Sequence, residues 1–256
     1  MDLSNKVAIV TGGASGLGRA TTDVLAAGGA KIAIFDLNAE LGAEAVKALG
    51  EDKAGFWSVD VASAESVEAA VAAVVEKFGR VDVLVNCAGV GPAKKIIDRD
   101  NNPMPLEDFS KLIGINLTGS FNVARCCAAE MAKNELVDGE RGVIIHTASV
   151  AAYEGQVGQC AYSASKGGIV GMTLPMARDL ATVGIRVNTV APGIMGTPLL
   201  RGMPQKVQDS LAATVPNPSR LGEPDEYGRL VRHMVENGYM NGETVRLDGA
   251  IRMQPR

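Results

Sequence analysis

The sequence predicts an α/β fold: a doubly wound parallel sheet of about seven strands, with helices on both of its faces. Short β-branched segments alternate with longer helical segments along the whole chain of 256 residues. Several short segments are almost continuously apolar, which is typical of parallel strands buried on both faces. A glycine-rich turn also joins the first strand to the first helix. Together these observations indicate a Rossmann-type sheet with right-handed crossovers.

Each expected element follows from its local pattern. The expected strands are Lys6–Val10, Lys31–Phe35, Phe56–Val61, Val81–Asn86, Val143–Thr147, Arg186–Val190 and Thr244–Leu247. Helices are expected between them, such as Leu17–Ala27, which Gly28-Gly29 ends, and Glu65–Phe78, which Ser63 begins and Gly79 ends. No linker or change in composition divides the chain. We therefore expect a single domain over residues 1–256.

Two segments interrupt the alternation of strands and helices. Residues 91–105 are polar and irregular, and residues 193–224 contain several prolines and glycines with a weak helical pattern around Gln205–Ala213. Both follow predicted strands, and in this architecture ligands bind at the carboxyl ends of the strands. We expect these two segments to be substrate loops.

Composition excludes several classes of function. The apolar content of 46% supports a large core, and the net charge of −4 gives no electrostatic basis for binding nucleic acid or an anionic membrane. No apolar run approaches the ~18 residues that span a bilayer. The first residues enter a strand pattern at once, so we expect no signal or transit peptide and a cytoplasmic location.

The cysteines and histidines do not suggest a metal site or a thiol nucleophile. Cys87, Cys126, Cys127 and Cys160 lack the spacing of metal ligands and lie in apolar or small-residue contexts. We expect all four to be reduced core residues. His146 lies within a predicted buried strand and is expected to be a core histidine instead of a ligand.

A glycine-rich turn after the first strand indicates a dinucleotide site. The segment reads Thr11-Gly12-Gly13-Ala14-Ser15-Gly16-Leu17-Gly18. Gly12 permits a tight turn, Gly16 a close approach of the pyrophosphate, and Gly18 close packing of the helix. The helix that follows offers free N–H groups and the positive end of its dipole to the phosphates.

The second strand ends in a carboxylate, Asp36, about 20 residues beyond the glycines, where an acidic residue binds a ribose 2′-hydroxyl. Its charge would repel a 2′-phosphate, and Leu37-Asn38-Ala39 contains no cation, so we expect NAD and not NADP. Asp36 could instead cap the following helix. Asp60-Val61 and Asn86-Cys87-Ala88-Gly89 end the next two strands and should face the same crevice.

Ser149 and the segment Tyr162-Ser163-Ala164-Ser165-Lys166 suggest acid–base chemistry. Residues four apart share one face of a helix. A phenol normally titrates near pH ~10, and a nearby ammonium lowers that pKa. Tyr162 with Lys166 is therefore interpreted as a tuned proton donor and acceptor, and Ser149 as the hydroxyl that holds a substrate oxygen. The alternative is a surface helix with a solvated lysine.

With these motifs, nearly the whole chain resembles the short-chain dehydrogenase/reductase family. The resemblance implies that Asn116, in Gly114-Ile115-Asn116-Leu117, serves a water relay that ends at Lys166, beside catalytic Ser149 and Tyr162. Lys166 and Tyr162 are implied to contact the cofactor as well. The further cofactor residues that it implies are Asp60, Val61, Asn86, Ala88, Gly89, Pro192, Gly193 and Thr197.

Within that family the chain is most similar to the type II 3-hydroxyacyl-CoA dehydrogenases, from segments 148–159, 167–175 and 246–255. This resemblance implies NAD-dependent interconversion of 3-hydroxyacyl-CoA and 3-oxoacyl-CoA by a homotetramer. The candidate substrate contacts are Gln156, Gln159, Leu199, Lys94 and Lys95. A hydroxysteroid or other secondary-alcohol dehydrogenase is the alternative. A 3-oxoacyl-carrier-protein reductase or a non-catalytic dinucleotide-binding scaffold is less favoured.

Overall fold

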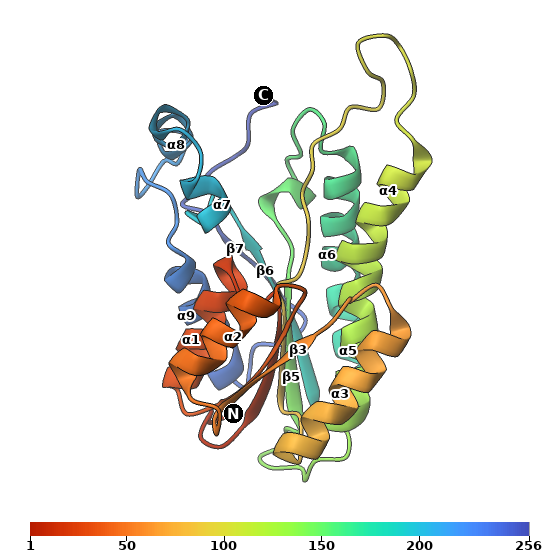
Figure 1. Cartoon of the computed structure of the whole chain (residues 1–256), viewed down its shortest axis with the longest axis vertical. Helices are drawn as coiled ribbons and strands as arrows, with labels where there is room; N and C mark the ends of the chain where they lie inside the picture. Colours follow the sequence, from red (N-terminus) through yellow and green to blue (C-terminus); the bar gives the residue numbers. More distant parts are fainter. Residues whose placement is uncertain (256) are drawn as a thin grey trace.

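Seven parallel strands form one sheet at the centre of the molecule (Figure 1), in the order β3-β2-β1-β4-β5-β6-β7. The structure is a computed structural model that describes residues 1–255. The strands are β1 (Val7–Thr11), β2 (Lys31–Asp36), β3 (Ala54–Ser58), β4 (Val83–Asn86), β5 (Gly142–Thr147), β6 (Ile185–Pro192) and β7 (Thr244–Leu247). The order reverses between β1 and β4, and such a reversal creates a crevice at the carboxyl ends of the strands.

Helices cover both faces of this sheet (Figure 1). One face carries α1 (Gly16–Ala27), α2 (Ala39–Leu49) and α9 (Pro224–Glu236), and the other carries α3 (Ala64–Phe78), α5 (Gly119–Met131) and α6 (Cys160–Ala181). The shorter elements are α4 (Leu106–Ile113), the π-helical turn η1 (Gly114–Thr118), the 3₁₀ turn η2 (Val150–Ala152), α7 (Pro198–Arg201) and α8 (Gln205–Ala212). The predicted doubly wound architecture is therefore confirmed.

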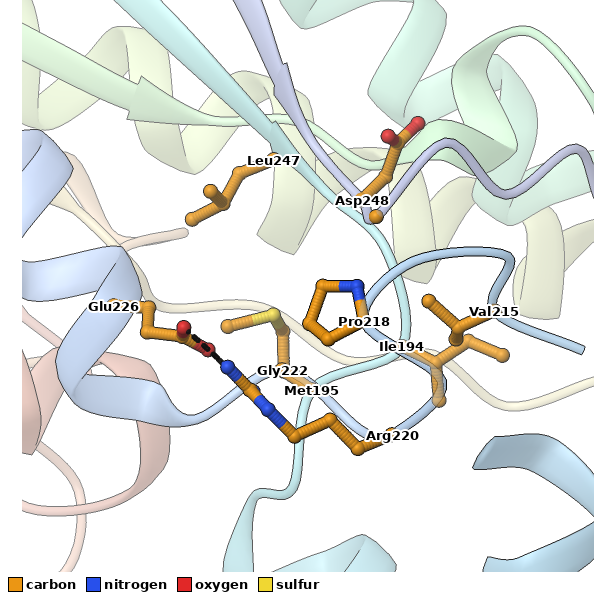
Figure 2. Close-up of a pocket in the computed structure, with 10 residues that line it drawn as sticks. Ile194, Met195, Val215, Pro218, Arg220, Gly222, Glu226, Leu247 and Asp248 are labelled. Atoms are coloured by element: carbon orange, nitrogen blue, oxygen red, sulfur yellow. Dashed lines mark hydrogen bonds and ion pairs between the residues drawn. The ribbon is translucent and has the colours of Figure 1, made fainter. Parts of the chain in front are cut away.

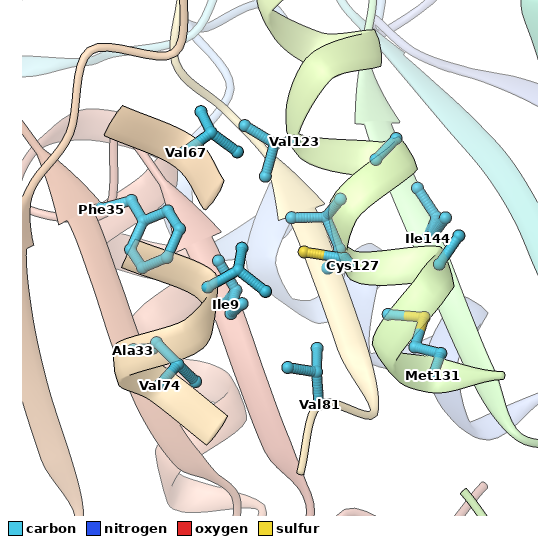
Figure 3. Close-up of a cluster of buried hydrophobic side chains, with 14 of the residues drawn as sticks. Ile9, Ala33, Phe35, Val67, Val74, Val81, Val123, Cys127, Met131 and Ile144 are labelled. Atoms are coloured by element: carbon cyan, nitrogen blue, oxygen red, sulfur yellow. The ribbon is translucent and has the colours of Figure 1, made fainter. Parts of the chain in front are cut away.

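Continuously apolar strands supply the core on both faces. Because successive side chains of a strand point to opposite faces, Val7 and Ile9 belong to the α3–α5–α6 side, whereas Ala8 and Val10 belong to the α1–α9 side. Figure 3 shows the first of these clusters, where Ile9 and Phe35 meet helix side chains such as Val67. Each such side chain, fully buried, stabilises the fold by about 1.5–3 kcal/mol.

All seven predicted strands are present, and the third differs most from its predicted bounds. The prediction was Phe56–Val61, whereas β3 ends at Ser58. Val59 and Val61 are apolar and buried because they pack into the core cluster after the strand has ended, not because they extend it. The Val61 carbonyl accepts a hydrogen bond from Asn122 Nδ2 (2.9 Å). The other strand ends lie within two residues of their predicted positions.

The two irregular segments lie at the end of the molecule where the strands finish. Residues 91–105 form a projecting loop between β4 and α4, and residues 193–224 carry the short helices α7 and α8 (Figure 1). Within residues 1–255, no helix combines the length and the apolar character that crossing a bilayer requires. The predicted helix near Gln205–Ala213 is present as α8.

Candidate active site

The glycine turn brings the start of α1 against the end of β1. Gly12 has φ of +62°, and a Cβ added there would lie 3.0 Å from the backbone nitrogen of Ala88. A Cβ at Gly18 would lie 2.1 Å from the carbonyl oxygen of Gly12, so only glycine allows this close packing. The side chain of Ser15 does not cap the helix. The first-turn N–H groups of α1, which lack partners inside the helix, remain available to an anion.

Asp36 ties the end of β2 to the glycine turn. Its carboxylate accepts hydrogen bonds from the backbone nitrogens of Ala14 (3.1 Å) and Asn38 (3.0 Å). The cap of α2 is Asn38, whose side chain accepts from the nitrogen of Leu41. The alternative in which Asp36 caps the following helix is therefore wrong. Leu37 is 70% exposed beside it, and the residues that follow, Leu37-Asn38-Ala39, contain no cation.

One cleft, the cofactor cleft, joins these parts. The predicted residues that line it are Gly12, Ser15, Gly16, Leu17, Gly18, Asp36, Asp60, Val61, Ala88, Gly89 and Thr197. Thr197 faces Gly16 across it, because a Cβ at Gly16 would lie 3.7 Å from Thr197 Cγ2. Free N–H groups at a helix start, a carboxylate at the end of β2 and glycines without side chains in one cleft fit a dinucleotide.

Apolar side chains complete the cofactor cleft, and sequence analysis did not single them out. They are Phe35, Leu37, Val59, Cys87, Val90 and Ile115. All six lie within or next to a predicted motif along the chain, so adjacency was an available signal. Ile115 is the direct neighbour of Asn116 and reaches the cleft from η1.

Three predicted cofactor residues lie at the strand ends without lining the cleft. Asn86 is buried, and its side chain donates to the carbonyl of Ser120 (3.1 Å). Pro192 ends β6, and the Gly193 nitrogen donates to the carbonyl of Leu247 (2.9 Å). Asn86 thus ties the end of β4 to α5, and Gly193 ties the end of β6 to that of β7.

Tyr162 and Lys166 lie one turn apart on α6, as predicted. Lys166 Nζ is 5.8 Å from the centroid of the Tyr162 ring and donates to the backbone oxygen of Thr147 at 2.8 Å. Lys166 is buried, whereas Tyr162 is only half-buried. The pair therefore presents a phenol to the opening and keeps its cation behind it, which excludes the alternative of a solvated surface lysine.

Burial controls the titration of this pair in the protein chain alone. It raises the pKa of Tyr162, and the nearby Ser149 hydroxyl opposes only part of that rise. It also lowers the pKa of Lys166 to about 8. The predicted lowering of the tyrosine pKa by the lysine is therefore not met by these side chains alone, because burial disfavours the charged phenolate.

Asn116 connects α6 to the loop that follows β4. It occupies η1, a π-helical turn between α4 and α5, and it is completely buried. Its Oδ1 accepts from the Val90 nitrogen (2.9 Å), and its Nδ2 donates to the Val90 oxygen (2.9 Å) and to Ser165 Oγ (3.1 Å). Both polar atoms of the Asn116 side chain therefore have hydrogen-bond partners. A π-helical turn is a frequent feature of functional sites.

Glycines allow this loop to approach the catalytic side chains. A Cβ at Gly89 would lie 3.1 Å from Asn116 Oδ1 and 3.7 Å from Lys166 Nζ. A Cβ at Gly91 would lie 3.4 Å from the Tyr162 ring. The structure therefore brings Asn116, Tyr162 and Lys166 together at the end of the cofactor cleft, and Ser149 beside Tyr162.

Two further hollows adjoin this site. The outer hollow contains four of the five predicted substrate contacts: Lys94, Lys95, Gln156 and Gln159. The inner hollow shares its Val90 and Ile115 with the cofactor cleft. Its other lining residues are Pro92, Ala93, Lys94, Met104, Asp108, Lys111, Leu112, Gly158 and Ala161. Leu199, the fifth predicted contact, is 82% exposed on α7 and lines neither hollow.

The polar residues of the outer hollow differ in how far other residues of the chain already bind them. Lys94 is paired with Asp108, and Gln156 donates to the backbone oxygen of Gln254 (2.9 Å). The Gln156 nitrogen donates to the Gln159 side chain (2.9 Å). Lys95 forms no ion pair with the rest of residues 1–255, which leaves its charge available at the rim.

Residues 193–224 pack against the end of β7 around a small, mainly apolar hollow. Figure 2 shows Ile194, Met195 and Val215 on its walls, with the Arg220–Glu226 ion pair at one side. That bidentate pair lowers the pKa of Glu226 to about 2. Contacts around this hollow hold residues 193–224 against the end of β7. The hollow shares no lining residue with the cofactor cleft.

The thiols agree only in part with the prediction of four core cysteines. All four are free, and Cys127 is buried, but Cys160 is exposed at the first position of α6. The small residues around it reflect a helix start and not a core. His146 is a core histidine as expected, completely buried, and burial lowers its pKa to about 4. Residues 1–255 contain no cluster of three or more side chains that would hold a metal ion.

Comparisons with known proteins agree with this geometry. The family model described as short chain dehydrogenase matches residues 6–208. The chain is 57% identical to 3-hydroxyacyl-CoA dehydrogenase type-2 of Bos taurus, over 97% of this chain and 96% of that one, and 34% identical to a 3-oxoacyl-acyl-carrier-protein reductase of Thermotoga maritima, over 98% and 99%. A solved structure, 3-hydroxyacyl-CoA dehydrogenase type-2 from Mycobacterium avium, superimposes with a TM-score of 0.94 at 45% identity and covers 98% of both chains. The chain therefore belongs to the short-chain dehydrogenase family.

Proposed function

We propose that this protein is an NAD-dependent dehydrogenase that interconverts 3-hydroxyacyl-CoA and 3-oxoacyl-CoA. The observation that carries the proposal is the position of Tyr162 and buried Lys166 directly behind the loop whose Gly89 lines the cofactor cleft, with Ser149 beside Tyr162. The names of relatives at 53–57% identity support the choice of substrate within the wider class of secondary alcohols.

In this mechanism Ser149 holds the substrate oxygen beside Tyr162. The Tyr162 phenolate removes the hydroxyl proton during oxidation, and the phenol returns it during reduction. NAD supplies the hydride chemistry when it is bound, and its oxidised ring adds a positive charge that favours the phenolate. That charge offsets the burial that raises the pKa of Tyr162 in the protein alone.

Lys166 and Asn116 support the proton transfer from behind. The Lys166 ammonium favours the phenolate and holds the nicotinamide ribose. Asn116 is proposed to serve a water relay that ends at Lys166, and its side-chain bonds to Val90 keep the loop in place above the lysine. Because burial lowers the pKa of Lys166 to about 8, this group can exchange a proton near neutral pH.

The coenzyme is NAD because of the charge at the end of β2. The Asp36 carboxylate accepts hydrogen bonds from the ribose hydroxyls and repels a 2′-phosphate. No cation follows it in Leu37-Asn38-Ala39. Gly12, Ser15, Gly16, Leu17 and Gly18 hold the pyrophosphate.

The two hollows are suited to a CoA thioester. We infer that the acyl chain enters the inner hollow, where Leu112, Met104 and Ile115 offer apolar surface. Lys95 at the outer rim offers a charge to the CoA phosphates, with Lys94, Gln156 and Gln159 as neighbours. Leu199 is proposed to close over the acyl chain from α7.

We further infer a homotetramer in the cytosol. Exposed apolar side chains on neighbouring elements, Leu106, Phe121 and Leu174, support contact with other copies. Four free cysteines are in keeping with a reducing compartment.

The test follows NADH consumption with acetoacetyl-CoA, beside a steroid ketone and a small ketone without CoA. Efficient turnover of the thioester alone supports the proposal. Turnover of another ketone, but not of the thioester, retains the mechanism and rejects the substrate. NADH binding without turnover of any of the three contradicts the enzymatic function and favours a non-catalytic dinucleotide-binding protein.

A further inference from the structure

Tyr227 lies on α9, on the opposite face of the sheet from Lys166, and its hydroxyl ends beneath the active site. The side chain is completely buried. Its hydroxyl lies 2.6 Å from Thr147 Oγ1 and 3.7 Å from Cys87 Sγ. The ring packs within the apolar cluster on this face, and a phenylalanine ring would meet that packing. The hydroxyl therefore requires a separate explanation.

The direction of the hydrogen bond between Tyr227 and Thr147 follows from a third group. Thr147 Oγ1 lies 2.6 Å from the backbone oxygen of Asn86, and a carbonyl can only accept. The Thr147 hydroxyl has one hydrogen, and this bond uses it. Tyr227 must therefore donate to Thr147, which in turn donates to Asn86.

This chain of hydrogen bonds joins two strand ends where regular pairing stops. The β4–β5 ladder ends at the pair Asn86 and His146, so the Thr147 hydroxyl adds a connection one residue beyond it. Asn86 leads directly into Cys87-Ala88-Gly89, which line the cofactor cleft. Tyr227 thus holds the base of the cleft without lining it.

Thr147 also provides the acceptor for Lys166. Within residues 1–255 its backbone oxygen is the one hydrogen-bond acceptor of Lys166 Nζ. The titratable groups that face this ammonium are Tyr162 on the same helix, Cys87 after β4 and His146 on β5. None of the three carries a negative charge at neutral pH, so the ammonium depends on this carbonyl for its position.

We propose that Tyr227 is a positioning residue for the reaction: by donating to Thr147, it fixes the carbonyl that holds Lys166 and the strand end that supports the cofactor cleft. The inference rests on the proposed function for its effect on turnover, and on NADH binding alone for a second, independent readout.

The first test is Tyr227→Phe, which removes one oxygen and keeps the ring. We expect kcat for alcohol oxidation to fall about fivefold to tenfold, and the acidic limb of its pH profile to move up by about half a pH unit or more. The upward direction follows because a displaced Lys166 favours the Tyr162 phenolate less. Tyr239→Phe, at a fully exposed tyrosine, is the matched control and should keep both values.

The second test needs no turnover. The pH dependence of NADH affinity, measured by fluorescence, reports the ammonium of Lys166, and its midpoint should fall in Tyr227→Phe because the charged form loses support. If the wild type binds NADH but is inactive, the proposed function fails, while this shift still tests the role of Tyr227.

Substitutions at Thr147 separate positioning from plain stability. Thr147→Ser should retain both pH midpoints, whereas Thr147→Val should shift them as Tyr227→Phe does, and the double variant should shift them no further. If Tyr227→Phe lowers only the melting temperature and leaves kcat and both midpoints at wild-type values, Tyr227 is a structural residue and the inference is wrong.

Discussion

The cofactor side of the site and the substrate side are held by different interactions. On the cofactor side, buried Asn86, Asn116 and Thr147 join strand ends to one another and to neighbouring helices and loops through hydrogen bonds shielded from water. On the side proposed for the substrate, residues 91–105 and 193–224 are mostly exposed and rely on pairs such as Lys94–Asp108. Exposed pairs contribute little, whereas buried polar networks specify one arrangement.

This difference matches the two tasks of the enzyme. Hydride transfer requires a fixed geometry, which the sheet supplies, and the choice of substrate is left to loops that can vary without disturbing it. Changes on the cofactor side should therefore affect chemistry or folding strongly, and changes on the substrate side should affect affinity modestly.

The largest effect is expected from Tyr162→Phe. Removal of the proton donor should lower kcat by about 10²–10⁴-fold, because positioned acid–base groups contribute on that scale. NADH affinity, measured by fluorescence titration, should stay close to the wild-type value. A variant that retains more than about a tenth of the wild-type kcat would show that the proton passes through another group.

His146 should make the stability of the cofactor side depend on pH. Its pKa is about 4 in the folded protein, against 6.5 when unperturbed. As pH falls from 6.5 towards 4, His146 binds a proton in the unfolded chain but not in the folded one. The free energy of unfolding therefore decreases. At about pH 5 this loss is about 2 kcal/mol relative to pH 7.

The measurement compares urea unfolding of the wild type and of His146→Asn at about pH 5 and about pH 7. The variant should show a pH dependence smaller by that amount. His233→Asn, at the exposed histidine of α9, is the matched control and should behave as the wild type does. Equal pH dependence in His146→Asn and wild type would contradict the assignment of a neutral, buried imidazole.

Asp36→Ala should weaken NAD binding by about tenfold, the scale of a hydrogen bond to a charged group. Discrimination against NADP should relax as well, because the repelling charge is gone. The ratio of kcat/KM with NAD to that with NADP measures this, and Asp36→Asn separates the charge from the contacts with Ala14 and Asn38. An unchanged ratio in both variants would remove Asp36 from coenzyme selection.

The smallest effect is expected at the substrate rim. Lys95→Ala should raise KM for acetoacetyl-CoA by about threefold, since an exposed charge pair contributes less than about 1 kcal/mol. The effect should shrink at high salt and be absent with a small ketone. Lys133→Ala, whose lysine pairs with Glu130 far from the rim, is the control. Equal effects on both ketones would contradict a contact with the CoA phosphates.

Much of the fold and of the candidate site could be predicted from the sequence, because these features depend on residues that are neighbours along the chain. The apolar strands, the turn from Thr11 to Gly18 and the spacing of Tyr162 and Lys166 are local patterns, and each took its predicted place. The extent of β3 was predicted wrongly because Val59 and Val61 pack like strand residues after the strand has ended. Cys160 was misplaced because small neighbours suit a helix start as well as a core.

Local patterns in the chain were enough to predict the doubly wound sheet, the glycine turn with Asp36 and the spacing of Tyr162 and Lys166 on α6. The folded arrangement alone sets the burial that lowers the pKa of Lys166 to about 8 and raises that of Tyr162. It also decided that Tyr227, 80 residues beyond Thr147, donates to the strand end that holds Lys166. Such features arise from contacts between distant segments, and no local pattern encodes the low dielectric that those contacts create.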